Sequence, residues 1–357
     1  MNLGELLDGV SAKHRSAVAT RIDLPKQATA AEICAHLLDP ARLQEIVDGL
    51  PPEARHCAAR QALGEDGPRN GYYSSRAADT GAQELERCGL AFALRDSWRT
   101  NYTVPDDVIG ALAQALACAH LEGRKAGRAG RWLGAPLQLA HDVATVWAAL
   151  HREPVRVKTD GEIYQRSWPK LLAALAALDL DELDEEIRDR RLLVALAFLR
   201  EEGCLRLRLD SSNGWETKRE LTAVGGLREL LAREPAELRG RLLAGAGCER
   251  LELAGLTLLL RLGPGVAISL ASFGRAAREF ADEATLHPTP RYGSDAQVGA
   301  SALLIGWLVG LAEIGLDSGG RPCAARLACL EAETSRGQLA VCQGNFEVVL
   351  LALPGAG

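Results

Sequence analysis

The chain has 357 residues, of which 47% are apolar and 25% charged, and its formal net charge is −6. This length predicts several modules rather than one small core, and the acidic balance excludes a surface coated uniformly with positive charge for nucleic acid. Apolar runs of about 18 residues without a charge are absent, so we expect no membrane span. The acidic N-terminus lacks the features of a signal peptide, and nine scattered cysteines predict free thiols in the cytoplasm. Arginine greatly outnumbers lysine, which indicates a GC-rich, bacterial genome.

Residues 1–50 are predicted to form an N-terminal helical segment. Apolar residues at helical spacing predict one amphipathic helix over residues 3–22. An extended link follows at 22–25, and Thr29 and Glu32 are spaced as a capping box for a second helix. The order helix, extended link, helix resembles the small SAP-type DNA-binding fold, and an ordinary helical hairpin would give the same pattern.

One sequence pattern occurs twice in the chain, over Leu85–Ile109 and over Leu199–Leu230. In each copy a helix closes with Glu and Gly, a strand of alternating apolar and polar residues follows, and a polar turn with a Trp leads into a second strand. The glycines, Gly89 and Gly203, fit the left-handed end of a helix. The alternation predicts a half-buried hairpin. Each copy therefore indicates the back half of a winged helix.

The two copies predict how the chain is divided, together with a fragment of the same pattern at Leu311–Leu316. The turns that contain Trp98 and Trp215 are expected to be the wings of two modules, and the fragment predicts a third, less regular unit. The predicted segments are the N-terminal helices at 1–50, a first winged-helix module at 51–121, a basic flexible linker at 122–135, a second winged-helix module at 136–234, and a C-terminal α/β module with the third winged-helix-like unit at 235–357.

The predicted linker is basic and rich in glycine. Residues 122–131 contain four basic residues and three glycines, a composition that does not pack into a core. Mobile cations here would reach the phosphates of DNA, or would serve solubility alone. The cations concerned are Arg124, Lys125, Arg128 and Arg131.

The second module has the element order of a complete winged helix. Helices are expected at 137–150, 159–178 and 184–202, with a short strand at 154–158 and the hairpin at the end. A winged helix presents such a strand and hairpin to the DNA backbone. The predicted backbone contacts are Arg156, Lys158, Arg166, Lys170, Lys218 and Arg219.

Charge in this part of the chain is unevenly distributed. Nine basic residues face five acidic ones between residues 121 and 170, whereas residues 179–186 are strongly acidic. Acids at the start of the third helix would repel phosphate at the end that normally contacts bases. We therefore expect contact with the DNA backbone, or docking of a protein, rather than groove reading.

The C-terminal module is predicted to mix strands and helices. Strands are expected at 256–262 and 266–270, a helix at 274–284, and a hairpin over 338–351.

Motifs of catalysis and metal binding are missing from the sequence. It contains no GxxxxGK[ST] phosphate loop, no GxSxG elbow, no HExxH and no CxxC pair. We therefore expect no catalytic residue, no metal site and no cofactor, and the chain is not itself a P-loop motor.

Three stretches together resemble the helicase-associated region found with bacterial XPB-type helicases. They are His36–Pro40, Trp147–Arg166 and Leu339–Leu350. In that family a strand of this form opens a domain beside the motor that contacts the substrate. Because the motor motifs are missing here, the resemblance implies a DNA-associated adaptor role and not duplex unwinding.

The sequence thus predicts a mainly α protein with short β-hairpins (α+β), built from tandem winged helices. We expect a non-enzymatic accessory protein that contacts DNA with little sequence preference, alongside a helicase or nuclease partner and without a membrane. The net acidity and the run at 179–186 favour an alternative, a protein-interaction scaffold that does not bind DNA.

Overall fold

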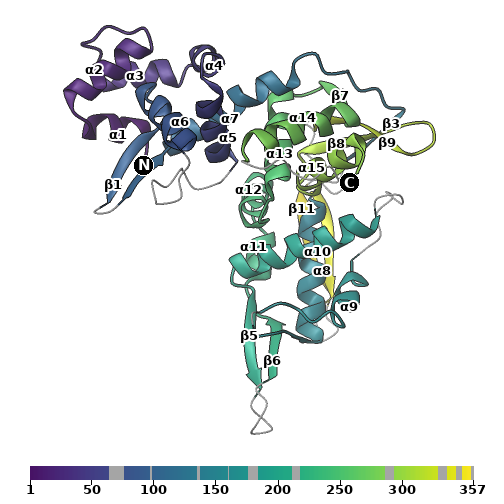
Figure 1. The fold of residues 1–357 in the computed structure, drawn as a ribbon. Helices are drawn as coiled ribbons and strands as arrows, with labels where there is room; N and C mark the ends of the chain where they lie inside the picture. The colour runs from purple at the N-terminus through teal and green to yellow at the C-terminus, as the bar shows by residue number, and fades with distance from the viewer. Residues whose placement is uncertain are drawn as a thin grey trace. The chain divides into compact units, whose positions relative to one another are not determined.

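The computed structural model describes residues 1–63, 76–96, 99–134, 137–159, 161–175, 184–210, 218–285, 293–328, 336–342 and 348–354. The chain is mainly helical with short antiparallel sheets (Figure 1), as the sequence predicts. Within these residues, no helix combines the length and the apolar character that a membrane crossing requires. The turns with Trp98 and Trp215 and most of the acidic run at 179–186 lie outside the described residues.

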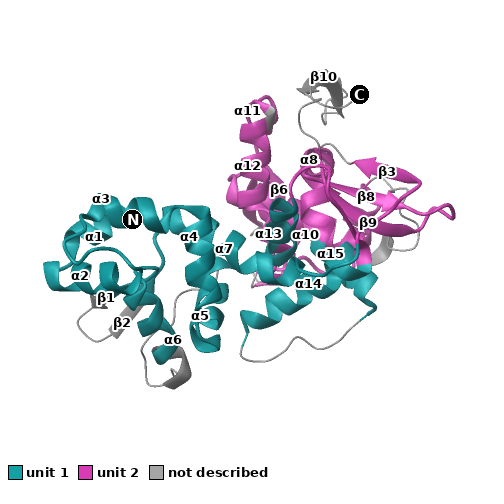
Figure 2. Cartoon of the chain, turned by 90° about the horizontal axis from the view of Figure 1, so that it is seen from above, with its two compact units in different colours: residues 1–125, 253–262, 271–302 teal, residues 126–252, 263–270, 303–357 magenta. Residues whose placement is uncertain are grey.

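The chain forms two compact units, which Figure 2 shows in different colours. Unit 1 comprises residues 1–125, 253–262 and 271–302, and unit 2 comprises residues 126–252, 263–270 and 303–357. The first division falls inside the predicted linker. The C-terminal third of the chain contributes residues to both units, so it is not a separate compact body.

Unit 1 is built from helices and one β-hairpin. Its N-terminal part contains α1 (Leu3–Gly9), α2 (Ala12–Arg21), α3 (Ala30–Leu37), α4 (Pro40–Asp48), α5 (Pro52–Ala62), α6 (Arg76–Arg87), β1 (Phe92–Asp96), β2 (Arg99–Thr103) and α7 (Asp106–Leu121). Most of α13 (Arg250–Leu262) and α14 (Leu270–Glu283) and the first part of α15 (Asp295–Leu308) also belong to it. The hairpin β1–β2 confirms the first predicted hairpin, and the described residues of 51–121 add no third strand to it.

The predicted single helix over residues 3–22 is wrong, because the chain forms α1 and α2 here. The backbone of Val10 is extended, and Ser11 caps α2 by accepting a hydrogen bond from the backbone N–H of His14 at 3.2 Å. Leu3 and Val18 are both buried, so the apolar spacing persists across a break that it does not reveal. The predicted capping box of the next helix is confirmed in α3.

Unit 2 contains the longer hairpins and two sheets of three or more strands. Its elements are β3 (Arg131–Gly134), α8 (Gln138–Arg152), β4 (Val155–Arg156), α9 (Trp168–Leu172), α10 (Asp184–Glu201), β5 (Leu205–Asp210), β6 (Lys218–Ala223), α11 (Leu227–Leu231), α12 (Pro235–Gly245), β7 (Ala267–Ser269), β8 (Ala312–Leu316), β9 (Pro322–Leu327), β10 (Arg336–Cys342) and β11 (Val348–Pro354), together with the end of α15. The hairpins β5–β6 and β10–β11 confirm two predicted hairpins.

Two stretches of the chain share one order of elements. The first runs α8, β4, α9, α10, β5, β6, and the second runs α13, β7, α14, α15, β8, β9. In both sheets the third strand pairs antiparallel with the first and with the second, which gives the orders β4-β6-β5 and β7-β9-β8. The second sheet has one additional strand, because β3 pairs with β8. The sequence predicts the first stretch in full but only a fragment of the second.

A predicted strand at 256–262 is wrong, because these residues form the second half of helix α13. The helix begins with a capping box between Glu249 and Glu252 and ends at Gly263, whose φ is 76°. A short apolar run fits a buried helix as well as a strand, so its periodicity does not decide between them. A Cβ at Gly255 would lie 2.2 Å from the carbonyl oxygen of Ala302, so this glycine permits close contact with α15.

The predicted flexible linker needs a correction in its second half. The N–H of Gly127 donates to the carbonyl of Ala267 at 2.9 Å, the N–H of Gly130 donates to Leu316 at 2.9 Å, and Arg131–Gly134 is strand β3. A Cβ at Gly127 would lie 2.4 Å from the carbonyl oxygen of Ile268. This glycine therefore allows the backbone to approach a strand closely, and it does not provide a flexible link.

Candidate nucleic-acid interface

The sheet β4-β6-β5 positions the cations that the structure leaves available in unit 2. Alternation along β5 directs Leu205 and Leu207 to one side, where Ala223 and Leu221 of β6 are their direct partners. Leu221 and Ala223 are buried, so this side of the sheet contributes to the core. The opposite side is polar and solvent-exposed.

The polar side of this sheet gathers three arginines around one carboxylate. Arg208 on β5 and Arg156 on β4 are both direct partners of Glu220 on β6, and Arg206 pairs with Thr222 on the same side. The three arginines are exposed, and their side chains make no hydrogen bond or ion pair with the described residues. Three cations against one acid, on a rigid sheet, form a compact positive surface. We call Arg156, Arg206, Arg208 and Glu220 the arginine face.

Of the predicted contacts in this module, Arg156 lies on the arginine face, and most of the others have partners within the protein. Lys158 forms an ion pair with Glu162 at 2.6 Å, and Lys170 forms one with Glu153 at 2.6 Å. The hydrogen bond from Lys170 lowers the pKa of Glu153.

Of the remaining predicted contacts of this module, two interact with neighbouring groups, and the side chain of the third lies outside the described residues. Arg219 donates to the carbonyl of Thr159 at 2.6 Å. The guanidinium of Arg166 lies 5.5 Å from the centre of the Tyr164 ring and is exposed. The side chain of Lys218 lies outside the described residues.

The four predicted linker cations differ in their surroundings. Arg124 donates to the carbonyl of His120 at 2.8 Å and forms an ion pair with Glu279, so its charge is neutralised within unit 1. The side chains of Lys125, Arg128 and Arg131 are exposed and have no hydrogen bond or ion pair with described residues. Of the four linker cations, only Arg124 therefore has its charge neutralised by a described carboxylate.

Helix α10 follows α8 and α9 in the second predicted module, and several of its polar side chains have partners within the protein. Arg191 and Asp142 are buried and form a two-pronged ion pair, with N–O distances of 2.6 and 2.8 Å. Arg190 is bonded to Glu252, and Asp189 accepts from the indole N–H of Trp168 at 2.7 Å.

The other described arginines of α10 also interact with the protein. Arg200 donates to the carbonyl of Gly161 at 3.2 Å, and Arg188 has a partner as well. Each arginine of this helix whose side chain is described is therefore engaged. This leaves α10 without a group of unpaired donors for reading bases.

Sequence reasoning missed Arg206 and Arg208. The alternation Leu205-Arg-Leu-Arg-Leu209 places both arginines on one face of a strand, and that signal was present. What the sequence does not give is the strand order, which brings Arg156 and Glu220 beside them. Within the described residues, no group of three or more metal-binding side chains occurs.

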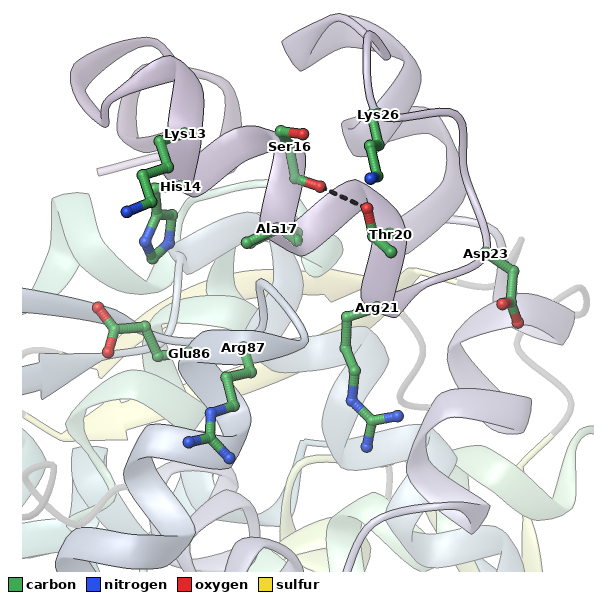
Figure 3. A pocket seen from close by; sticks show the side chains of 11 residues that line it. Lys13, His14, Ser16, Ala17, Thr20, Arg21, Asp23, Lys26, Glu86 and Arg87 are labelled. Atoms are coloured by element: carbon green, nitrogen blue, oxygen red, sulfur yellow. Dashed lines mark hydrogen bonds between the residues drawn. The ribbon is translucent and has the colours of Figure 1, made fainter.

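Unit 1 contains a groove that sequence reasoning also missed. It has a volume of about 790 Å³ and lies between α2, the turn after it, and the end of α6 (Figure 3). Its lining residues are Lys13, His14, Ser16, Ala17, Val18, Thr20, Arg21, Asp23, Lys26, Glu86 and Arg87. Comparisons of the whole sequence with protein-family models and with curated proteins gave no match. The site must therefore be interpreted from its own geometry.

Proposed function

We propose that this protein is a non-enzymatic accessory protein that binds the DNA backbone through the arginine face. Arg156, Arg206 and Arg208 are exposed, unpaired with described residues, and held on one side of a three-stranded sheet. This is the observation that supports the proposal. Arginine offers a planar fork of N–H donors that fits phosphate oxygens, and the sheet fixes the spacing of the backbone positions from which these side chains extend.

The order of elements from α8 to β6, with its sheet β4-β6-β5, supports the interpretation of residues 138–223 as a winged helix. In that interpretation β5 and β6 are the strands of the wing. The elements from α13 to β9 follow the same order along the chain.

Contact through the wing and not through the third helix makes binding insensitive to sequence. The arginines of α10 have partners within the protein, so base edges would meet no unpaired guanidinium there. Phosphate contacts position a protein on DNA but do not report the bases. A protein of this kind would act beside a helicase or nuclease that supplies the catalysis, as the resemblance to helicase-associated regions implies.

The proposal is tested by the salt dependence of binding to a duplex. Each phosphate contact that is lost should flatten the slope of log affinity against log salt by about 0.9. The double variant Arg206→Ala/Arg208→Ala should weaken binding to every duplex equally and reduce the slope by about two. Arg228→Ala, which removes an exposed arginine of α11 in the same unit, is the control. An unchanged slope in the double variant would reject the arginine face as the contact.

A protein-interaction scaffold is the second candidate, and β5 supports it. This strand is an edge of its sheet, and its apolar side leaves Leu207 45% and Leu209 59% exposed. An open edge with exposed apolar side chains can accept an extended segment of another protein. If the wild-type chain shows no salt-dependent affinity for DNA, and Leu207→Ser/Leu209→Ser abolishes capture of a partner, the scaffold interpretation replaces the first.

A further inference from the structure

The groove of unit 1 between α2 and α6 has the size of a small-molecule site. Its volume of about 790 Å³ lies within the range of roughly 300–1,000 Å³ that is typical of ligand pockets. One wall is a face of α2, which contributes Ser16, Ala17 and Thr20. The turn after α2 and the last residues of α6 complete it (Figure 3).

The lining of this groove is positive in an otherwise acidic protein. Four residues are cationic at neutral pH, and only Asp23 and Glu86 are acidic. Lys13 and Lys26 are exposed, and their side chains have no hydrogen bond or ion pair with the described residues. Two ammonium groups without counter-ions, at one groove, attract an anion.

The two arginines of the groove are fixed in place by a carboxylate beside it. Arg21 donates to Oε1 of Glu84 at 2.6 Å, and Arg87 donates to Oε2 of the same carboxylate at 3.1 Å. Figure 3 shows the two guanidinium groups pointing the same way. A guanidinium has five N–H donors, so each arginine keeps donors for a ligand after it has bound Glu84. The hydrogen bond from Arg21 lowers the pKa of Glu84, which keeps this carboxylate charged.

His14 provides an independent sign that a polar ligand belongs here. It lines the groove, and its Nε2 is buried without a hydrogen-bond partner. A buried nitrogen of this kind loses its hydrogen bond to water, and a hydrogen bond from its N–H to an oxygen of a ligand would replace that bond. A phosphate group has oxygens for His14 and for the cations at once.

We infer that the groove binds a phosphate-bearing ligand of about the size of a nucleotide. The cations Lys13, Arg21, Lys26 and Arg87 bind the phosphate oxygens, and the N–H of His14 donates to one of them. The same chemistry is offered by a free nucleotide and by the phosphates of a single DNA strand. This site belongs to unit 1 and is independent of the arginine face, so either proposal can fail without the other.

Calorimetric titration of the full chain with pyrophosphate, ATP and a short oligothymidine tests the inference. We expect saturable binding of pyrophosphate, and Lys13→Ala/Lys26→Ala should weaken it about tenfold, since two exposed ammonium groups are removed. Both lysines are exposed, so the double variant should fold normally. Lys125→Ala, which removes an exposed lysine of unit 1 outside the groove, should bind like the wild type.

The remaining titrations distinguish the two sources of phosphate. If ATP binds more tightly than pyrophosphate and oligothymidine does not compete, the ligand is a free nucleotide. If oligothymidine displaces pyrophosphate from the wild type and from the Lys125→Ala control alike, the ligand is a strand. Absence of binding by every phosphate probe, or equal binding by the wild type and Lys13→Ala/Lys26→Ala, overturns the inference.

Discussion

Helices α10 and α15 hold the same place in two stretches of equal element order, yet they are stabilised in opposite ways. Residues 298–308, which make up most of α15, are buried apart from Ser301. In α10, by contrast, Arg191 forms a buried ion pair with Asp142 of α8. A helix that is apolar on every side is a core element. Neither helix therefore has an unpaired cation among its described side chains.

The hairpins that follow the two helices differ as well. The turn between β8 and β9 is tight, because Asp317 accepts hydrogen bonds from the N–H groups of Gly319 and Arg321 at 2.8 and 2.9 Å. The edge of β8 is covered by β3, whereas no described strand pairs with the corresponding edge of β5. The β5–β6 hairpin contains Arg206 and Arg208, whose side chains have no hydrogen bond or ion pair with described residues.

The largest expected effect comes from breaking the buried ion pair between Arg191 of α10 and Asp142 of α8. Asp142→Ala leaves the buried guanidinium of Arg191 without its carboxylate, which should destabilise the module by about 3–5 kcal/mol. Hydrogen exchange of the α8 and α10 amides measures the loss. The double variant Asp142→Leu/Arg191→Met, which removes both charges, should recover most of it. A loss below about 1 kcal/mol in Asp142→Ala would show that the pair does not hold α10.

Truncating a buried side chain of α15 should lower the stability nearly as much, because it leaves a cavity in the core. Ile305 is fully buried, so Ile305→Ala removes apolar contacts and should destabilise the surrounding core by about 2–5 kcal/mol. Ser301→Ala, on the exposed side of the same helix, should change stability by less than about 0.5 kcal/mol. Chemical unfolding of the two variants measures the difference. Equal stabilities would contradict the assignment of α15 as a core helix.

The segment that leads into β3 is tested by substituting its glycines, Gly127 and Gly130. A Cβ at Gly127 would lie 2.4 Å from the carbonyl oxygen of Ile268, so Gly127→Ala should destabilise unit 2 by about 1–3 kcal/mol. Gly130 is the matched control, because a Cβ there would lie 3.8 Å from Leu316 in ordinary contact. Urea midpoints of the two variants provide the measurement. If both substitutions are tolerated alike, this segment is flexible, as the sequence alone suggests.

The smallest expected effect is a pH dependence confined to one stretch. Burial lowers the pKa of His141 on α8 below its ordinary value of 6.5. The unfolded chain therefore binds a proton more readily, so the stability of this module should fall as the pH drops through 6.5 and level off below the folded pKa. Hydrogen exchange of α8 at pH 7.5 and 5.5 measures the change. His141→Gln should reduce it; an unaltered pH dependence in that variant would assign the effect to another group.

Sequence patterns predict local structure here better than they predict surfaces. Period-two alternation locates the β5–β6 hairpin correctly, because a strand with one buried face must alternate. The pattern of the apolar run at 256–262 does not distinguish a strand from a helix, and these residues form part of α13. Local pattern is therefore informative where apolar and polar residues alternate along a strand, and uninformative in a short apolar run.

The candidate surfaces depend on which segments meet, and sequence spacing does not contain this. Lys158 and Lys170 are predicted as DNA contacts, but the fold gives each of them a carboxylate partner. Arg206 and Arg208 have no hydrogen bond or ion pair with described residues, and the strand order that places Arg156 and Glu220 beside them is a property of the whole sheet. The groove between α2 and α6 joins residues more than sixty positions apart.

The most direct test of the arginine face is to remove its single acid. Glu220→Gln keeps the strand and deletes the negative charge between Arg156 and Arg208. Duplex affinity at low salt should then rise by about threefold to fivefold, whereas Glu313→Gln, on β8 of the other sheet, should leave it unchanged. Unchanged or weaker binding by Glu220→Gln would contradict DNA contact through this face.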